Sequence, residues 1–503
     1  MAGSVKLLIR NTFFRVESLG DRLCGPELNP FHQLGALGWF FSWIVLGTGL
    51  YLFIPFETSV GGAWASVEYI TVHQWWLGGI VRSLHRYGSD CMVAVMVIHL
   101  LREFAMDRYH GARWFAWITG VPLIWLILAS GVTGYWLVWD ELAQYLGVGT
   151  AEWLDWLGIF GQSIARNFLT RGSLTDRFFT LLIFIHIAVP LFLLFGMWIH
   201  ILRVNHPAMT PPRKMRLWTT AMLLGLSLVF PAKSHPPADL GRASDVLNPD
   251  WFYMALYPAF DTWGPAVAWA LALGLTAVIA IVPWVGRRRR AAAAVVQLSE
   301  CSGCGHCAAD CPFGAVVMRP RMDGLAHEKQ AVMQPDLCTG CGICVGSCPS
   351  STPFRKSKPL ISGIELESLP VEALRDRVLA AAAPLTGPAR LLVLGCDHGV
   401  DLKRFETPSV AALSLPCTGM LPPSFLDFIL SRTGATGVVV TGCRGGECHH
   451  RLGPQWTDAR IAAAREPHLP KRTDRDRLRV VWAAPTDPDP IAAAIAQLSE
   501  VKS

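Results

Sequence analysis

The chain has 503 residues, of which 52% are hydrophobic and only 16% are charged, and its formal net charge is +6. This composition excludes a disordered or collagen-like protein and argues against a purely soluble one, and so small a charge does not indicate a nucleic-acid partner. Eighteen of the 20 tryptophans lie before residue 290, whereas twelve of the 14 cysteines lie after residue 300. We therefore expect a membrane part followed by a metal-binding part.

Six apolar runs in the first part are candidates for membrane-spanning helices. They lie at residues 36–56, 89–101, 114–138, 178–202, 217–231 and 262–286. A helix needs about 20 residues to cross the hydrocarbon core of a bilayer. The second run reaches this length if its helix starts near Trp75, and the 217–231 run falls short of it. We predict an all-α bundle of six transmembrane helices over residues 1–290.

Basic residues gather at alternate ends of these runs and set an orientation. They are Lys6, Arg10, Arg15, Arg22, Arg102, Arg108, Arg113, Arg203, Arg213, Lys214, Arg216 and Arg287–Arg290. The loop between the first two runs contains Glu57 and Glu68 but no lysine or arginine. The positive-inside rule therefore predicts a multi-pass protein of the cytoplasmic (inner) membrane, in contact with lipid, with both termini in the cytoplasm. Residues 1–20 are predicted as a basic amphipathic segment on the cytoplasmic surface.

Two histidine pairs share one spacing inside the predicted helices. His85 and His99 are 14 residues apart, and so are His186 and His200. On an α-helix, 14 residues return to within about 40° of the same face after a rise of about 21 Å, so each helix offers two imidazoles at two depths. Two such helices form two stacked bis-imidazole sites, for which haem iron is the natural occupant. The alternative, a satisfied polar histidine, does not explain a duplicated spacing.

Two glycine pairs repeat the same interval on the other long helices. They are Gly35 with Gly49 and Gly120 with Gly134. Because a glycine lets a flat macrocycle approach the backbone closely, we expect one glycine beside each haem level. The alternative interpretation is helix packing, for which membrane helices also use glycine.

Residues 30–290 resemble the cytochrome b of quinol-oxidising cytochrome bc and b6f complexes. The resemblance is carried by SLHRYGSDCMVAVMVIHLLREF (83–104), WITGVPLIWLILASGVTGYWLVWD (117–140) and FIHIAVPLFLLFGMWIHI (184–201). It implies two b haems, one held by His85 and His186 near the outer face and one held by His99 and His200 near the cytoplasm. It also implies that arginines neutralise the haem propionates, and the matching positions are Arg82, Arg86 and Arg102. For these arginines the alternative is ordinary snorkelling at the interface.

A second match concerns quinone. Pro249, Asp250, Trp251 and Phe252 stand where this family carries Pro-Glu-Trp-Tyr at its outer quinone site. The resemblance implies that Asp250 accepts a quinol proton. Aspartate is one methylene shorter than glutamate and Phe252 lacks a hydroxyl, so the chain departs from the family at both positions, and a simple loop is the alternative.

A repeated cysteine motif follows an alanine-rich linker at 291–297. The pattern C-x2-C-x2-C-x3-C-P occurs twice, from Cys301 to Pro312 and from Cys338 to Pro349. It is the pattern of two-cluster ferredoxins, in which three close thiolates hold one 4Fe–4S cluster and the fourth reaches the other. We expect a small α+β domain over 298–352 with two ligand sets. These are Cys301, Cys304, Cys307 and Cys348, and Cys338, Cys341, Cys344 and Cys311. Structural zinc, the alternative, uses pairs of Cys-x2-Cys.

The remaining residues are predicted as a linker with one charged helix, 353–387, and a small α/β domain with a parallel sheet, 388–503. Strands are expected at 390–396, 411–417, 437–443 and 479–484, and helices at 423–434 and 457–466. Cys396, Cys417 and Cys443 end predicted strands, where ligands gather in open sheets, and Cys448 follows them.

Residues from about 388 to 460 resemble the delta subunit of methyl-viologen-reducing hydrogenases, most closely in GATGVVVTGCRGGECHHRLG (434–453). The resemblance implies one 2Fe–2S cluster on Cys396, Cys417, Cys443 and Cys448, and a flavin-containing partner of the heterodisulfide reductase kind. The family begins with a Cys-x-x-Cys pair where this chain has Gly399. Two alternatives therefore stay open: a docking domain without a cluster, and ligation by His398, His449 or His450.

Together these parts predict a membrane electron-transfer subunit of a quinone-linked oxidoreductase. Electrons from a cytoplasmic flavoprotein docked on residues 388–503 would pass the ferredoxin domain and the two haems to quinone. The chain shows no dinucleotide or flavin fingerprint and no Rieske motif, so we expect one subunit of a larger complex, without its own dehydrogenase site. There are two alternatives. In one, quinol is oxidised near Asp250 and the membrane potential drives electrons in the reverse direction, towards low-potential cytoplasmic acceptors. In the other, the chain is a redox-sensing membrane anchor. A dimer is expected by analogy with cytochrome b.

Overall fold

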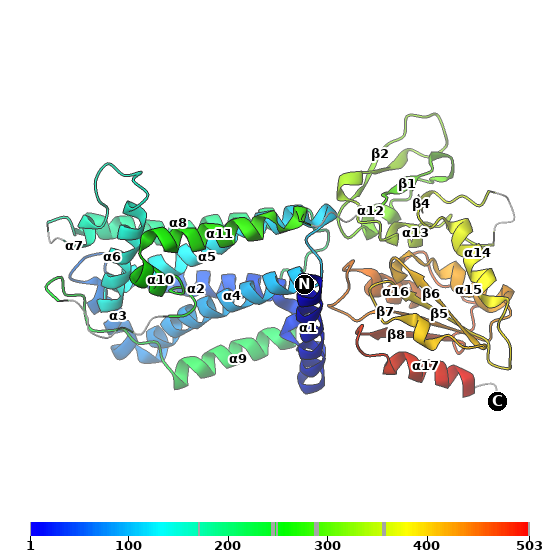
Figure 1. Ribbon diagram of the computed structural model, residues 1–503, viewed down its shortest axis with the longest axis horizontal. Coiled ribbons are helices and arrows are strands. Elements are labelled where there is room, and N and C mark those ends of the chain that lie inside the picture. Colours follow the sequence, from blue (N-terminus) through cyan, green and yellow to red (C-terminus); the bar gives the residue numbers. More distant parts are fainter. Residues whose placement is uncertain are drawn as a thin grey trace.

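The computed structural model describes residues 2–169, 172–242, 247, 250–285, 291–354 and 359–500. An elongated helical bundle forms the N-terminal part, and two small lobes containing all the strands lie together at one end of it (Figure 1). The change from tryptophan-rich to cysteine-rich sequence therefore coincides with a change of architecture.

Two helix pairs form the centre of the bundle. Helix α2 (Leu34–Phe53) packs along α4 (Ile80–Ala105), and α5 (Trp114–Val138) packs along α8 (Asp176–Ile201). Helix α9 (Arg213–Val229) lies against α4, and α11 (Pro265–Ile281) lies against α5. Side chains from α2, α4, α5 and α8, among them Phe41, Met92, Leu123 and Leu193, share one buried cluster. This cluster holds the two histidine-bearing helices, α4 and α8, in one core.

Four of the six predicted membrane helices have the length and composition of a membrane span. They are Pro30–Phe53, Gly111–Val138, Asp176–Ile201 and Pro265–Trp284. Helix α4 has 26 residues but carries several charged side chains, and α9 has only 17 residues. Six transmembrane helices therefore remain a prediction, in which α4 would keep its charges inside the bundle.

Further helices occupy the two ends of the bundle. Helix α1 (Ala2–Cys24) runs across the end that faces the lobes, which accords with the predicted surface segment (Figure 1). The opposite end carries α3 (Ala63–Glu68), α6 (Glu141–Asp155), α7 (Arg166–Leu169) and α10 (Tyr257–Trp263), none of which the apolar runs predicted. The basic run 287–290 lies outside the described residues.

The first lobe contains the repeated cysteine motif. Strands β2 (Val316–Pro320) and β3 (Lys329–Met333) pair antiparallel, and the short helices α12 (His306–Asp310) and α13 (Ile343–Gly346) follow the cysteine loops. The segments predicted as linkers contribute a second antiparallel pair, β1 (Ala294–Val296) with β4 (Ile364–Leu366). Helix α14 (Val371–Ala382) follows β4 and shares a hydrophobic core with both lobes.

The second lobe is a four-stranded parallel sheet in the order β6-β5-β7-β8. Its elements are β5 (Leu391–Cys396), β6 (Val410–Leu415), α15 (Pro423–Arg432), β7 (Gly437–Cys443), α16 (Gly453–Ile461), β8 (Leu478–Ala483) and α17 (Asp489–Glu500). Side chains alternate between the faces of a strand. Leu392 and Leu394 of β5 accordingly belong to the core shared with α14 and α15, and Leu391 and Val393 to the core shared with α17. The predicted parallel sheet is present.

A buried ion pair joins the two lobes. Arg460 of α16 and Asp310 of α12 have side chains that are 1% and 2% exposed. Arg460 also donates to Gly419 O at 2.8 Å and to Ser347 Oγ at 2.7 Å. Asp310 receives a further bond from Arg465. The two lobes therefore share charged as well as apolar contacts.

Replacing Arg460 by methionine should destabilise the paired lobes, because Asp310 would keep its buried charge while losing its most buried partner. Breaking such a pair costs about 3–5 kcal/mol, which corresponds to roughly 10 °C in melting temperature for a unit of about 200 residues. Thermal unfolding of the full chain in detergent, followed by loss of the iron–sulfur absorption of the lobes, measures the shift. Arg319→Met changes an exposed arginine of β2 and should leave the melting temperature unchanged.

Candidate metal centres

The four histidines predicted as haem ligands form two pairs. His85 on α4 and His186 on α8 have ring centroids 6.3 Å apart and planes inclined by 65°. A metal ion bound to two imidazole nitrogens at about 2.0 Å each puts the ring centroids roughly 6 Å apart. His99 and His200 lie close enough to interact electrostatically. The donor sets therefore fit two bis-imidazole haems.

A threonine and a backbone carbonyl orient most of these rings. His85 Nδ1 lies 3.1 Å from Thr48 Oγ1 and 3.1 Å from Val45 O. Because the carbonyl only accepts, it favours the proton on Nδ1 and leaves Nε2 free to bind iron. Thr133 Oγ1 lies 3.2 Å from His186 Nδ1, and Thr119 Oγ1 lies 3.2 Å from His200 Nδ1.

The predicted glycines lie against the histidine rings. A Cβ built on Gly49, Gly120 or Gly134 would lie 3.0 Å, 3.3 Å and 2.9 Å from Cε1 of His85, His200 and His186 respectively. A Cβ on Gly35 would meet nothing within 4 Å. Three of the four glycines thus make room for a histidine ring, and each directly follows an orienting threonine. The Thr-Gly dipeptide is a sequence signal that identifies the orienting threonines, and our prediction from glycine spacing missed it.

Replacing Gly134 by alanine should weaken haem binding at the His85–His186 site, because a Cβ 2.9 Å from His186 Cε1 forces the ring to move. We expect up to about one haem per chain to be lost, since an axial imidazole must point at the iron. The pyridine haemochrome assay measures haem per chain. Gly274→Ala on α11, where a Cβ meets nothing within 4 Å, is the matched control and should retain both haems.

The predicted propionate arginines and Asp250 have protein partners. Arg86 forms an ion pair with Asp250, whose Oδ2 also accepts from Tyr135 Oη at 2.5 Å. Arg82 donates to Ser234 Oγ at 2.8 Å, and Arg102 donates to Glu17 Oε1 at 2.6 Å. The Arg86–Asp250 contact joins two residues to which the sequence assigned different roles. Pro249 of the predicted quinone motif lies outside the described residues.

A cavity of about 280 Å³ lies beside Arg82, between the start of α4 and the end of α9. Its lining includes Thr71 and Ser234, both of which accept hydrogen bonds from Arg82, and the apolar side chains Trp75 and Leu228. Glu68 and Lys233 also line the cavity, and a mostly apolar cavity with a few polar groups suits a ligand with a polar head.

The cysteines of the first lobe converge in the two predicted sets. Cys301, Cys304, Cys307 and Cys348 line one pocket. Cys344 interacts with the other three members of the second set, Cys338, Cys341 and Cys311. Burial raises the pKa of the Cys307 and Cys341 thiols to about 12, so bound iron is what would keep these sulfurs as thiolates. Both sets fit 4Fe–4S clusters.

Four further cysteines meet at the carboxyl edge of the parallel sheet. Cys396 Sγ and Cys443 Sγ are 3.7 Å apart, and hydrogen bonds from Cys417 and Cys443 lower the pKa of Cys448. All four are buried. Cys396 and Cys443 are the last residues of β5 and β7, whereas Cys417, predicted to end a strand, lies two residues beyond β6. The strand order reverses between β5 and β7, which is where ligands bind in such sheets. The set fits one 2Fe–2S cluster.

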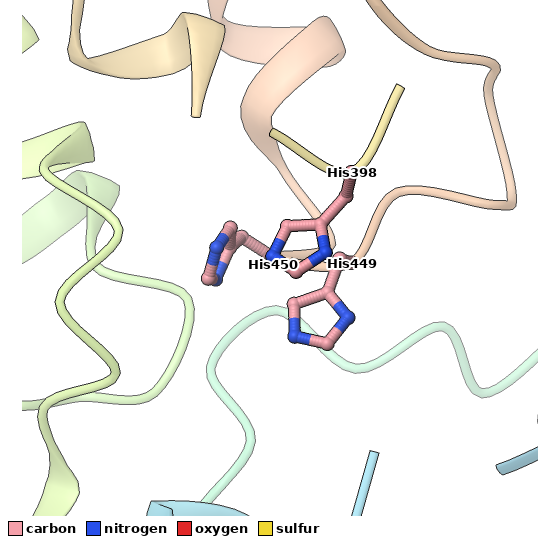
Figure 2. A group of neighbouring side chains, drawn as sticks. All are labelled: His398, His449 and His450. Atoms are coloured by element: carbon pink, nitrogen blue, oxygen red, sulfur yellow. The ribbon is translucent and has the colours of Figure 1, made fainter. Parts of the chain in front are cut away.

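Three histidines, His398, His449 and His450, form a group of neighbouring side chains (Figure 2). His398 N donates to Cys396 Sγ at 3.3 Å, which places this group next to the four cysteines. His398 and His449 stack with centroids 3.8 Å apart and planes only 16° apart. Nearly parallel rings cannot direct their in-plane lone pairs at one ion. Burial lowers the pKa of His450 to about 3, and Arg113 acts in the same direction. We therefore assign no metal to this group.

The loop after β7 docks on the end of the bundle, which the sequence did not predict. Arg108 donates to Glu447 O at 2.5 Å, and Arg113 donates to His449 O. Arg451 in turn donates to Asn205 O at 2.7 Å. Asn205 Nδ2 also donates to Cys311 O, at 3.0 Å, in the first lobe. Both lobes thus contact the segment that directly follows His200 on α8.

Known families match three separate parts of the chain. Residues 19–208 match Cytochrome b/b6/petB, 288–352 match the 4Fe–4S dicluster domain, and 393–502 match the methyl-viologen-reducing hydrogenase delta subunit. Cytochrome b6 of Prochlorothrix hollandica is 28% identical over 210 residues, which are 40% of this chain and 93% of that protein. Cytochrome b6 of Porphyra purpurea is 29% identical over 204 residues, covering 39% and 91% respectively.

A solved structure titled "Hyperthermophilic respiratory Complex III" aligns with a TM-score of 0.41 and 19% identity, covering 50% of this chain and 75% of that one. The family matches imply haem b in the membrane part and 4Fe–4S clusters in the first lobe. In order along the chain, three regions are therefore similar to cytochrome b/b6, to the 4Fe–4S dicluster domain and to the delta subunit of methyl-viologen-reducing hydrogenase.

Proposed function

We propose that this chain is the membrane electron-transfer subunit of a quinone-linked oxidoreductase. The observation that carries the proposal is the continuity of its ligand sites from the bundle into both lobes. His200 is followed by Asn205, which contacts both the loop that bears Cys448 and the backbone of Cys311. When bound, two haems and three iron–sulfur clusters would supply one-electron transfer along this series.

The contacts support a different order of the metal centres along the electron path from the one that the sequence suggested. Cys417 of the second lobe and Cys341 of the first share one buried apolar cluster, so these two ligand sets are neighbours. Both sets adjoin the bundle through Asn205. The set of Cys301 has an exposed member, Cys304. We therefore place electron exchange with a soluble flavoprotein at Cys304 rather than on residues 388–503.

Quinone would react within the bundle, and the cavity beside Arg82 is the site we assign to it. Asp250 is not among the residues that line this cavity, and it would accept a quinol proton only after releasing Arg86 and Tyr135. The lobes would lie in the cytoplasm, six helices would span the membrane, and two copies would form a dimer, as in cytochrome b complexes.

Quinone-driven oxidation of the haems tests this function. The full chain in lipid nanodiscs is reduced without oxygen by reduced methyl viologen, and the haem α-bands are followed after adding a menaquinone or a ubiquinone analogue. Rapid bleaching of the bands by one quinone is expected. Bands that neither quinone reoxidises would contradict the proposal. Reduction by quinol that requires a membrane potential in vesicles would instead support reverse flow.

A further inference from the structure

A second group of metal-ligand side chains lies where α1, the turn η1 (Pro30–Gln33) and the loop after β7 meet. Glu17, His32 and Glu447 each offer a donor atom, and these atoms lie within 4.8 Å of one another. The side chains of Glu17, His32 and Glu447 are 0%, 2% and 2% exposed. The three residues come from the membrane part and from the last domain, so the group exists only when the two are docked.

In each of these side chains, one polar atom has a hydrogen-bond partner and the other has none. Glu17 Oε1 accepts from Arg102 Nε at 2.6 Å, Glu447 Oε1 accepts from Arg444, and His32 Nε2 lies 2.9 Å from Asp21 Oδ1. Within the described residues, Glu17 Oε2, Glu447 Oε2 and His32 Nδ1 are buried without a hydrogen-bond partner. In metal sites, neighbouring carboxylates and arginines usually hydrogen-bond to one side of each ligand. The other side of the ligand is then free to bind the metal.

The chemistry of the donor atoms favours a metal cation here. The free carboxylate ends of Glu17 and Glu447 lie within hydrogen-bond reach of each other. Two carboxylates and one neutral imidazole form an oxygen and nitrogen donor set that suits Zn²⁺. Donors around one such ion lie roughly 3–4 Å apart, so a small contraction closes the site.

We propose that Glu17, His32 and Glu447 bind one Zn²⁺ ion that fastens the last domain to the membrane domain. Glu447 directly precedes Cys448, so the ion would hold the loop that carries this cysteine against α1 and α4. This site contains no cysteine and is separate from the haem and iron–sulfur ligands.

Zinc binding to the full chain, with haems and clusters intact, tests the proposal. After dialysis against a chelator, the protein is titrated with Zn²⁺, and the bound metal is measured by elemental analysis. We expect about one zinc ion per chain, with nitrogen and oxygen neighbours at about 2.0–2.2 Å in the X-ray absorption spectrum. No retained zinc, or sulfur neighbours at about 2.3 Å, would overturn the proposal, because sulfur marks binding to the cysteines.

Variants locate the ion. His32→Gln and Glu17→Gln should each weaken Zn²⁺ binding by roughly 100-fold. Glu27→Gln, an exposed glutamate close to η1 in the chain, should bind like the wild type. Equal binding by all of the variants would place zinc elsewhere and overturn the proposal. His32→Gln leaves the Glu17–Arg102 pair intact, and the haem spectrum reports assembly of each variant. The readout is independent of quinone activity, so this proposal and the proposed function can fail separately.

Discussion

A His200→Ala protein is expected to bind about one haem per chain instead of two, because haem iron held without covalent attachment depends on both axial imidazoles. The remaining haem should be the one between His85 and His186, whose rings keep their facing geometry. Because His200 belongs to the pair next to the lobes, electrons from the clusters should no longer reach that remaining haem. The haemochrome assay and a redox titration of the α-bands measure both effects.

His186→Ala provides the matched comparison. It should also lose one haem, but the haem left behind should still be reduced from the clusters. His73→Ala changes an exposed histidine of the bundle and should retain two haems. Two haems in the His200→Ala protein would show that His200 is not a ligand.

A Cys448→Ser protein is expected to lose about two iron atoms per chain, because a 2Fe–2S cluster needs four ligands and serine replaces thiolate poorly. Cys448 is buried and bonds to Cys417 and Cys443, so no other cysteine can take its place without moving the loop. The 4Fe–4S signals and both haems should remain, since their ligands are elsewhere. Low-temperature electron paramagnetic resonance of the dithionite-reduced protein distinguishes the cluster types.

The control for this variant is Cys24→Ser, which changes the exposed cysteine at the end of α1 and should keep all iron. Unchanged iron content and an unchanged spectrum in Cys448→Ser would mean that the second lobe holds no cluster at Cys448. The open alternative of a docking domain without a cluster would then be favoured.

The ligand groups were predictable from sequence because periodic structure repeats them at fixed intervals. A 14-residue spacing on a helix places His85 above His99, and cysteines that end parallel strands meet at one sheet edge. The ligand set of Cys301 was predictable as well, because the short spacing of its cysteines in one loop keeps their sulfur atoms close together. Of the six membrane helices predicted from apolar runs, four have the length and composition of a membrane span. The apolar runs did not predict α6 or α10, which lack a continuous apolar run.

Contacts between distant segments were decided only by the tertiary structure. Arg86 meets Asp250, Arg460 meets Asp310, and Glu17 meets Glu447, although from 150 to more than 400 residues separate the partners in the chain. No local periodicity encodes such pairs, because they depend on how the lobes dock on the bundle and on each other. That docking also determines which cysteines lie near the segment that follows His200. Local spacing in the sequence therefore predicts which side chains form each ligand set, and the docking of the lobes sets the order of these ligand sets in space.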